Sequence, residues 1–518
     1  MNVGVPPHVV VRTFVQRGLV QVQPPHRTVA QLWALKRWGY GLVGSIRSAA
    51  TVSGSQIALV DESRSLTYAD VVTLGERLAG VLVERGIGPG TVVGLLAPNG
   101  VDFVLACFAA ESLGCDVVLV NAGFTPEQVT RTIQRYAVTA LLVDPDLASL
   151  ATGAPVTHDL GELIGAAEGQ AYPPARPPAR TGRAIVLTSG TTGTPKGAPR
   201  RPPVGASTLV TMIERIPMRR GERVFLGAPL FHTWGLAALQ LAIGLRATIV
   251  LRRRAEPSAT LALLAQERIR TWISVPVIVD RVLLARRATP TALPDLELIV
   301  VSGSALRPGL STEVLDAFGP VLYSVYGSTE ASWATIATPA DFRADPATAG
   351  RPPVGTRVVV ADSAGRPVPE GVEGRVLVGN EMLFEGYLGV GRPEMQDGLL
   401  DTGDLGFWRD GRLRVTGRAD QMIVSGGENV YPQELEFALH ALPGVREAAA
   451  VGVPDDTFGA RLVAYVVPAP GASLTPAGIQ RALRSAVARH VRPREVYVVP
   501  DLPRNATGKI DLTALRAR

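Results

Sequence analysis

"TSGTTGTPKG", residues 188–197, is the stretch of this sequence that decides the fold. It follows "RAIVL" at 183–187, an apolar run typical of a buried strand. Its glycines let backbone N–H groups turn toward an anion, and its hydroxyl side chains add donors. Such a loop at the carboxyl end of a strand predicts an open α/β sheet that binds phosphate. It is not a Walker A loop, because Pro195 precedes Lys196 and Gly197 follows it. A flexible loop without a ligand stays open as the alternative.

Strand and helix patterns alternate on the N-terminal side of this loop. Apolar runs at 92–98, 115–120 and 139–144 read as strands, and 101–114 and 125–136 read as helices. Thr125, Pro126 and Gln128 form a capping box with proline in the first helical position. The resulting βαβαβ order predicts a parallel sheet covered by helices.

The pattern of predicted strands and helices changes twice on the C-terminal side of the loop. Further strands and helices alternate up to about residue 348, short strands and turns follow from Ala349, and a compact α+β unit follows Arg418. We expect an α/β protein with a large N-terminal domain of layered sheets, a β-rich subdomain and a small, mobile α+β C-terminal domain. The expected divisions are a basic, aromatic N-terminal segment at 1–60, the large domain at 61–417, and the small domain at 418–518.

The net charge of +6 is concentrated at the N-terminus, where no acidic residue precedes Asp61. The stretch "VAQLWALKRWGYGLVGSI" at 29–46 mixes aromatic, apolar and basic residues. One interpretation is a helix that lies on anionic lipid. The other, favoured because it is commoner, is a helix packed on its own domain with a solvated basic face.

Several classes are disfavoured by composition. Cys107 and Cys115 lie in an apolar region and suggest no disulfide framework. No apolar run reaches the roughly 20 residues of a membrane span, and no signal peptide is expected. No basic stripe recurs beside exposed aromatic residues, so nucleic acid is not an expected partner. A cytoplasmic location is therefore expected, with the inner membrane face left open as a peripheral site, and a homodimer stays open too.

Lysine is rare in this chain, which has only Lys36, Lys196 and Lys509 among 52 lysine and arginine residues. Lys196 and Lys509 lie in the glycine-bearing loops "TPKGA" and "NATGKID". Where arginine is otherwise so dominant, a surviving lysine indicates a position that needs a compact point charge.

Seven motifs in order resemble those of the adenylate-forming enzymes and span about residues 65–509. They are "TSGTTGTPKG", "PLFHTWG", "VSGSAL", "YGSTE", "DTGDLG", "GRADQMIVSGGENVYPQELE" and "PRNATGKID". The resemblance implies that a carboxylate attacks the α-phosphorus of ATP, releasing pyrophosphate, and that a thiol then displaces AMP. ATP, Mg²⁺ and CoA are the cofactors and co-substrates that it implies. It also implies that the domain at 61–417 binds AMP and the acyl group, and that the domain at 418–518 is mobile.

The resemblance also implies roles for individual residues. Lys509, Lys196, Glu330 and His232 are the expected catalytic residues; Lys509 bridges carboxylate and α-phosphate, Glu330 holds Mg²⁺, and His232 borders the carboxylate. Asp404 accepts from the ribose, Arg418 reaches the nucleotide, Asp420 is the hinge, and Trp234 lines the acyl pocket. The other expected nucleotide- and CoA-binding residues are Thr188, Ser189, Gly190, Thr191, Thr192, Gly193, Gly303, Ser304, Ala305, Tyr326, Gly327, Ser328, Thr329, Gly426 and Gly427.

"SGGENVYPQELE" resembles the fatty acyl-CoA synthetase branch most closely, and "LAALQLAIG" after "FHTWG" offers an apolar wall. We therefore expect a medium- to long-chain fatty acid as substrate. No carrier domain follows Lys509 before Arg518, which favours CoA as acceptor. The alternatives are a ligase for aryl or other acids, an acyl-AMP ligase that feeds a carrier protein, and a catalytically silent acyl or nucleotide sensor.

Overall fold

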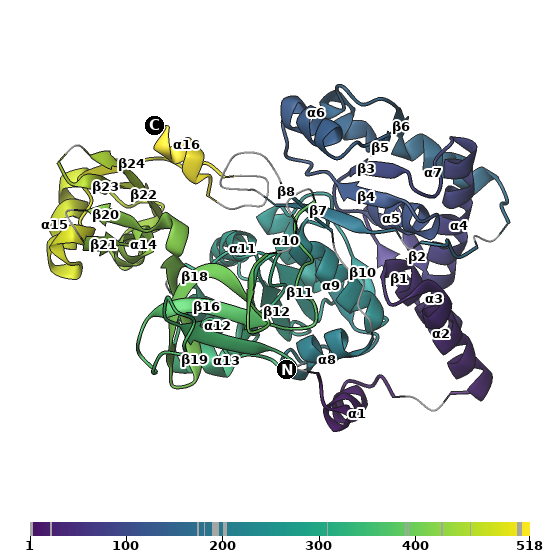
Figure 1. The fold of residues 1–518 in the computed structure, drawn as a ribbon, viewed down its shortest axis with the longest axis horizontal. Helices are drawn as coiled ribbons and strands as arrows, with labels where there is room; N and C mark the ends of the chain where they lie inside the picture. The colour runs from purple at the N-terminus through teal and green to yellow at the C-terminus, as the bar shows by residue number, and fades with distance from the viewer. Residues whose placement is uncertain are drawn as a thin grey trace.

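The computed structural model of this chain describes residues 4–20, 23–173, 176–180, 182–188, 196–199, 205–307, 309–388, 391, 393–425, 428–455, 457–504 and 510–517. Two layered sheets form the body, and a smaller α+β unit stands apart from it (Figure 1). The α/β class and the large-plus-small architecture predicted from the sequence are confirmed.

The first sheet contains the strands that flank the glycine-rich loop. Its order is β6-β5-β3-β4-β7-β8, with every neighbouring pair parallel except β7 and β8. The predicted βαβαβ run is thus a parallel unit, and Thr125 and Gln128 form the predicted capping box at the start of α6 (Pro126–Arg135). The strands are β3 (Val92–Leu96), β4 (Asp116–Leu119), β5 (Ala140–Val143), β6 (Thr157–Asp159), β7 (Ala184–Thr188) and β8 (Lys196–Pro199).

The second sheet has eight strands in the order β14-β13-β12-β11-β9-β10-β1-β2, antiparallel only at its two edges. Leu298 and Val300 of β12 pack toward the first sheet, while Ile299 and Val301 pack on the opposite side. This strand is apolar throughout because both its faces are buried. The strands are β1 (Ile57–Val60), β2 (Ser65–Thr67), β9 (Arg223–Leu226), β10 (Thr248–Val250), β11 (Thr271–Ser274), β12 (Leu298–Val301), β13 (Leu322–Tyr326) and β14 (Thr335–Ala337).

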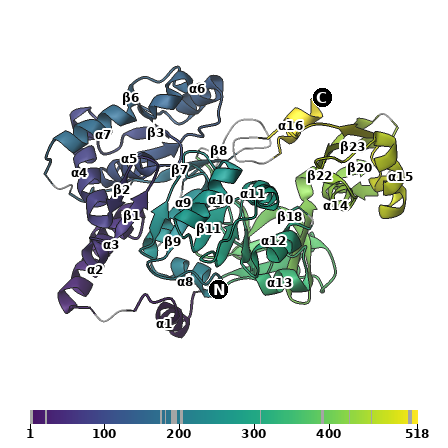
Figure 2. The same ribbon diagram turned by 180° about the vertical axis from the view of Figure 1, so that it is seen from behind.

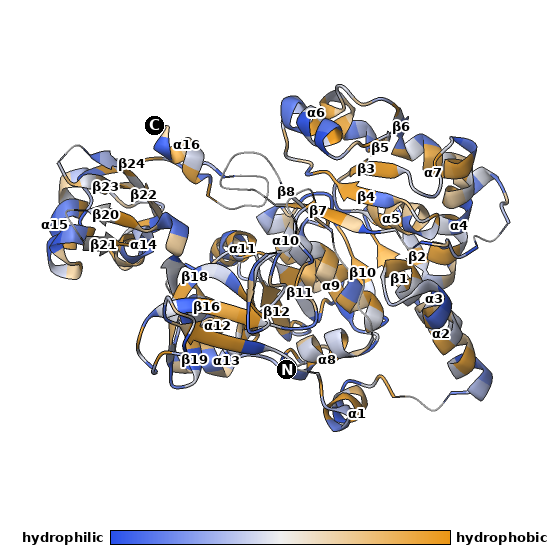
Figure 3. Ribbon diagram, viewed as in Figure 1, coloured by the Kyte–Doolittle hydropathy of each residue, from blue (hydrophilic) through white to orange (hydrophobic). Residues whose placement is uncertain are grey.

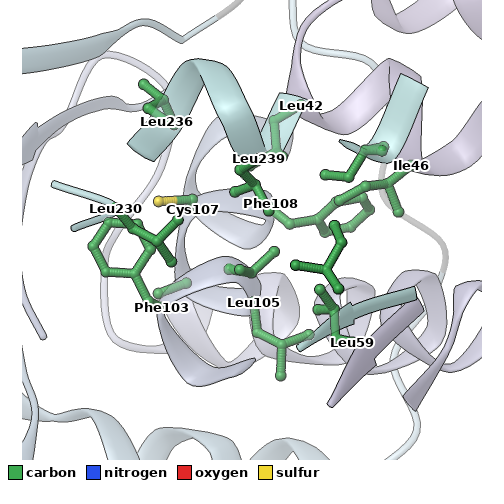
Figure 4. Packing of buried hydrophobic residues seen from close by; sticks show 14 of the residues in the cluster. Leu42, Ile46, Leu59, Phe103, Leu105, Cys107, Phe108, Leu230, Leu236 and Leu239 are labelled. Atoms are coloured by element: carbon green, nitrogen blue, oxygen red, sulfur yellow. The ribbon is translucent and has the colours of Figure 1, made fainter. Parts of the chain in front are cut away.

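Helices fill the space between the sheets and cover their outer faces. The central layer contains α3 (Leu42–Ser53), α5 (Val101–Ser112) and α9 (Thr233–Gly244), whose apolar side chains interdigitate in Figure 4. The outer helices pack on the far sides, α6 on the six-stranded sheet and α10–α12 on the eight-stranded sheet. The remaining helices of the body are α4 (Tyr68–Glu84), α7 (Leu160–Gly169), α8 (Ser207–Arg215), α10 (Pro257–Gln266), α11 (Pro276–Ala288), α12 (Leu310–Phe318) and α13 (Pro339–Ala344), with the 3₁₀ turn η1 (Pro145–Leu150). Apolar strands enclosed by more polar outer helices are visible in Figure 3.

The C-terminal third is built from two smaller sheets. The first contains β15 (Arg357–Ala361), β16 (Gly374–Gly379), β17 (Met395–Gln396), β18 (Leu399–Arg409) and β19 (Arg412–Arg418). The second belongs to the separate α+β unit, which projects from the body in both views (Figures 1 and 2). It contains β20 (Ile423–Ser425), β21 (Glu428–Val430), β22 (Val445–Asp455), β23 (Gly459–Pro468), β24 (Glu495–Val498), α14 (Pro432–His440), α15 (Pro476–Ala486), α16 (Leu512–Arg516) and the 3₁₀ turn η3 (Arg489–Val491), and η2 (Ala419–Gln421) precedes it.

The N-terminal segment forms more than the single helix expected at 29–46. Its helices are α1 (Pro7–Gln16), α2 (Pro25–Trp38) and α3. The chain breaks between α2 and α3 because Gly39 has φ +78°, a left-handed conformation that favours glycine. Arg47 of α3 pairs with Glu76 at 2.6 Å and stacks over Trp38, which fixes this segment to the body. Among the residues that the structure describes, every helix is too short or too polar to cross a bilayer.

Candidate active site

The glycine-rich loop connects two paired strands. Thr188 at the end of β7 lies opposite Lys196 at the start of β8, so the loop is anchored on both sides. The predicted residues Ser189, Gly190, Thr191, Thr192 and Gly193 lie outside the described part of the chain. The ammonium of Lys196 lies 5.4 Å from the centroid of the Tyr387 ring, a cation–π contact.

Glu330 contacts the same tyrosine as Lys196. The Tyr387 hydroxyl donates a short hydrogen bond to the Glu330 carboxylate, and the Phe384 N–H donates to the Glu330 carbonyl oxygen at 2.9 Å. Tyr387 therefore links Lys196 to the expected Mg²⁺ ligand. In the described ranges, no three histidine, cysteine or acidic side chains gather as a metal site. A Mg²⁺ ion at the Glu330 carboxylate, a donor that suits it, would complete its coordination with phosphate and water oxygens.

Asp404 is held in place by two side chains, Tyr326 and Arg418. It receives a hydrogen bond from the Tyr326 hydroxyl at 2.5 Å and pairs with Arg418 at 3.3 Å. Burial raises the pKa of Asp404, and the Tyr326 hydroxyl and Arg418 act against that increase. Burial also raises the pKa of Tyr326, and the Asp404 charge adds to the effect. The tyrosine thus stays a proton donor to Asp404 across the neutral pH range.

The expected adenine wall follows the ends of β12 and β13. Gly303, Ser304 and Ala305 line one cavity together with Tyr326 and Gly327. Gly303 has φ +95°, so a side chain there would strain the backbone. A Cβ on Gly327 would stand 2.2 Å from the Ser332 carbonyl oxygen, which leaves room for glycine alone.

The start of α9 brings the "FHTWG" motif to the same cavity. His232 is the N-cap residue, and its ring packs edge-on against Phe231 at 4.6 Å between centroids. Thr233 and Thr329 are joined by a hydrogen bond of 3.0 Å between their hydroxyls, which connects this motif to "YGSTE". The Trp234 indole donates to the Ser274 carbonyl oxygen at 2.9 Å, so the ring is held at the carboxyl end of β11.

The junction with the small unit is also part of the cavity wall. Arg418 ends β19 and pairs with Asp420 of η2 at 2.8 Å. The Asp420 carboxylate raises the pKa of Arg418 through this hydrogen bond, so the guanidinium stays charged. The predicted residues Gly426, Gly427 and Lys509 lie outside the described part of the chain.

One cavity of about 1380 Å³ joins most of the predicted residues that the structure describes. Those on its wall are Lys196, His232, Trp234, Gly303, Ser304, Ala305, Tyr326, Gly327, Ser328, Thr329, Glu330, Asp404, Arg418 and Asp420. The cavity continues along α9 into the central layer and reaches residues of α2 and α3. Sequence reasoning missed Tyr387 and the contribution of the N-terminal helices, because neither lies in a motif that marks a ligand.

Layered α/β sheets with a large cavity at the carboxyl ends of their strands define a nucleotide-binding α/β enzyme. The chain belongs to the AMP-binding enzyme family. The profile of that family matches residues 46–388, and the profile of the AMP-binding enzyme C-terminal domain matches residues 434–509. The resemblance to adenylate-forming enzymes is thereby confirmed.

Relatives of known activity match over nearly the whole chain. Feruloyl-CoA synthase of an Amycolatopsis species is 30% identical, covering 90% of this chain and 97% of its own length. Indoleacetate–CoA ligase of Aromatoleum aromaticum is 32% identical, covering 88% and 94%. The long-chain-fatty-acid–CoA ligase FadD13 of Mycobacterium tuberculosis is 29% identical, covering 91% and 97%. These relatives act on different acids.

Solved structures share the fold. The anthranilate CoA ligase AuaEII, in complex with anthranoyl-AMP, superimposes with a TM-score of 0.83 at 25% identity, covering 92% of this chain and 97% of its own. ATP-bound MatB from Rhodopseudomonas palustris superimposes with a TM-score of 0.82 at 28% identity, covering 92% and 98%. ATP binding by this chain is consistent with both its family and these neighbours.

Proposed function

We propose that this chain, an adenylate-forming acid–CoA ligase, activates a medium- to long-chain fatty acid. A carboxylate oxygen of the acid attacks the α-phosphorus of ATP, the bond to pyrophosphate breaks, and acyl-AMP forms. The sulfur of CoA then attacks the acyl carbon, AMP leaves, and acyl-CoA forms. The observation that carries the proposal is the long apolar extension of the cavity along α9.

The first step joins two anions, so charge neutralisation and alignment are the tasks of the site. Glu330 would hold Mg²⁺, whose charge would offset that of the phosphates, and Lys196 and the loop after Thr188 bind the β- and γ-phosphates. Asp404 accepts hydrogen bonds from the ribose hydroxyls, and the Tyr326 hydroxyl keeps its carboxylate in place. His232 borders the reacting carboxylate, and Lys509 stabilises the charge that develops in the transition state.

The second step needs a different arrangement of the small unit, because Lys509 must leave before a thiol enters. We assign the hinge to Asp420 and the domain boundary to residue 418. Beside Arg418, β18 contacts η2 and α14 contacts β19, so the small unit meets the body at this segment. Gly426 and Gly427 would then border the path of the pantetheine arm, where the absence of side chains permits close approach.

Apolar side chains support a fatty acid as substrate. Trp234, Leu236 and Leu241 of α9 and Leu209 and Met212 of α8 line the extension of the cavity. Its total volume exceeds the roughly 300–1000 Å³ of ordinary small-molecule pockets, which suits ATP together with an acyl chain. FadD13 is a relative that acts on long-chain fatty acids. Feruloyl- and indoleacetate-specific relatives favour the alternative of an aryl acid.

Pyrophosphate release measured with a panel of acids tests this function. The panel contains acetate, octanoate, palmitate, benzoate, ferulate and indoleacetate, each with and without CoA, and Lys509→Ala is the control variant. We expect the highest kcat/KM with octanoate or palmitate, formation of acyl-CoA, and loss of turnover in the variant. Preference for ferulate or benzoate would support the aryl-acid alternative. Acyl-AMP formation that needs a carrier protein would indicate an acyl-AMP ligase, and no turnover at all would favour a sensor.

We also propose that α1 and α2 rest on an anionic membrane surface. Six large apolar side chains of this segment are exposed to solvent: Val11, Val15, Val20, Val29, Leu32 and Trp33. Arg37 stacks over the Trp33 ring at 4.8 Å, and Arg27 and Lys36 are exposed nearby. Because no acidic residue precedes Asp61, this segment attracts anionic lipid, and its exposed apolar side chains suit the headgroup boundary.

Vesicle sedimentation tests the membrane contact. We expect the protein to pellet with vesicles containing phosphatidylglycerol, to pellet less with pure phosphatidylcholine, and to be released by salt, which screens the attraction. The double change Val29→Asp and Trp33→Asp should weaken the binding. Val156→Asp is the matched control, because Val156 is a similarly exposed valine outside α1–α3. Equal binding by both variants would refute the assignment.

A further inference from the structure

Glu111 is a partly buried acid that none of the steps above uses. It lies near the end of α5, a helix whose residues 103–110 are all apolar and buried. Burial raises the pKa of the Glu111 carboxyl to about 8, so the group is largely uncharged at neutral pH. Among the described residues, the structure shows no hydrogen bond or ion pair to this carboxyl, and its side chain lines the cavity. Such a group in a native protein needs an explanation.

Part of the Glu111 surface is open to the cavity, whose wall it forms together with Ser48, Ala184 and Arg246. This end is remote from the nucleotide. Cys115 follows Glu111 by four residues and packs against Gly182, which lies just before β7. A Cβ added to Gly182 would stand 2.0 Å from the Cys115 carbonyl oxygen. From Ala184 to Thr188, β7 covers roughly 13 Å.

The length of helix α9 gives a second estimate of the distance between the reacting carboxylate and Glu111. His232 caps its start, beside the reacting carboxylate, and its 12 residues span roughly 18 Å. Arg246 follows its end and lines the cavity with Ser48 and Glu111. The wall along α9 is mainly apolar, with Leu236, Leu241 and Ile243 beside Gln240, and Ser48, Glu111 and Arg246 lie at its remote end.

We propose that Glu111 binds a hydroxyl group on the acyl chain, at the end far from the reacting carboxylate. The proposal deepens the proposed function, because it requires the acid to occupy this cavity. A hydroxyl donates and accepts, so it matches the carboxyl in either protonation state. A second carboxylate would place an acid beside an acid, and an ammonium group would bury a charge. Glu111 is therefore assigned as a specificity-determining residue.

Paired substrates test this assignment. Plain acids from octanoate to palmitate are compared with the ω-hydroxy acid of each length, in the wild type and in Glu111→Gln and Glu111→Leu. At the best length, we expect the wild type to favour the hydroxy acid by about tenfold in kcat/KM, the size of one net buried hydrogen bond. Glu111→Gln should keep most of this ratio, and Glu111→Leu should reduce it to about one or invert it.

Binding without turnover separates this inference from the proposed function. Trp234 lies on the cavity wall, so its fluorescence reports acid binding in the absence of ATP. The same ratio of affinities is expected there, even if CoA transfer fails. Ser112→Ala is the matched control, because Ser112 is buried beside Glu111 and does not line the cavity.

Two results would overturn the assignment. One is a hydroxy-to-plain ratio that is the same in the wild type and in Glu111→Leu, by turnover and by fluorescence. The other is a preference for the dicarboxylic acid of the same length that disappears in Arg246→Met and persists in Glu111→Leu. The second result would place the recognition of the distal group at Arg246.

Discussion

The Tyr326 hydroxyl stands 2.5 Å from a carboxylate oxygen of Asp404, and this hydrogen bond ties the end of β13 to β18. Two motifs separated by 78 positions thereby form one unit. Because the other carboxylate oxygen of Asp404 pairs with Arg418, the tyrosine and the arginine together fix the orientation of the carboxylate. We expect the effects of changing either residue on nucleotide binding to be strongly coupled.

Tyr326→Phe removes this hydroxyl and keeps the ring. We expect the KM for ATP to rise about tenfold, the cost of one lost hydrogen bond to a charged group, with little change in kcat. Initial rates at varied ATP concentration and saturating acid check this. Asp404→Asn should raise the KM for ATP further. An unchanged KM in both variants would show that Asp404 does not contact the nucleotide.

Glu330→Gln removes a carboxylate that Tyr387 contacts and that we assign to Mg²⁺. We expect kcat to fall about a hundredfold, and the Mg²⁺ concentration at half-maximal rate to rise, because a neutral amide is a weaker ligand. Mg²⁺ titrations of both proteins check this. Glu381→Gln is the matched control, since Glu381 accepts hydrogen bonds from Ser207 and Thr208 and does not line the cavity. An equal Mg²⁺ dependence in all three proteins would remove Glu330 as a ligand.

Asp420→Ala separates the two half-reactions. Asp420 pairs with Arg418 at the junction, so its loss should alter the motion of the small unit more than the adenylation chemistry. We expect the transfer of the acyl group to CoA to slow at least tenfold, with pyrophosphate release in the first turnover slowed less. Single-turnover measurements with and without CoA distinguish the steps. Equal slowing of both steps would argue against a hinge at this residue.

Glu111→Gln changes how stability depends on pH. The wild-type carboxyl has a pKa of about 8 when folded and the ordinary value of 4.5 when unfolded. Between these values the folded protein binds more protons, so its free energy of unfolding falls as pH rises, by up to about 1.4 kcal/mol per unit. Glutamine has no such slope. We expect the Tm of the variant minus that of the wild type to grow from pH 5 to pH 8 and then level off. A constant difference would place Glu111 in contact with water.

Much of the fold was predictable because local patterns and global topology agree. The periodicity of residues 92–144 predicts the parallel unit that is observed, and Thr125 marks the start of its second helix. The motifs also predict that Asp404 and Tyr326 serve one nucleotide, although nothing in the sequence shows that they share a hydrogen bond. Long-range pairs of this kind depend on the packing of strands, which spacing does not reveal.

The acyl side of the site was harder to predict. Glu111 follows an apolar helical run, so its sequence position suggests an ordinary solvated helix end. Only the packing of α3, α5 and β7 places it on the cavity wall. Tyr387 likewise lies in "FEGYLG", outside the seven motifs, and reaches Glu330 and Lys196 through tertiary structure. The break at Gly39 was missed because a glycine within a helical pattern is often tolerated.

The side chain of Asn99 lies between the two sheets. Its amide donates to the Ala228 carbonyl oxygen at 2.9 Å and accepts from the Leu230 N–H at 2.8 Å, just before the "FHTWG" motif. A loop of the first sheet therefore sets the position of His232, which belongs to the second. Any slippage of one sheet against the other would move His232, which we place beside the reacting carboxylate, before it disrupted the core. On warming, this enzyme should lose its activity some degrees below the temperature at which it melts.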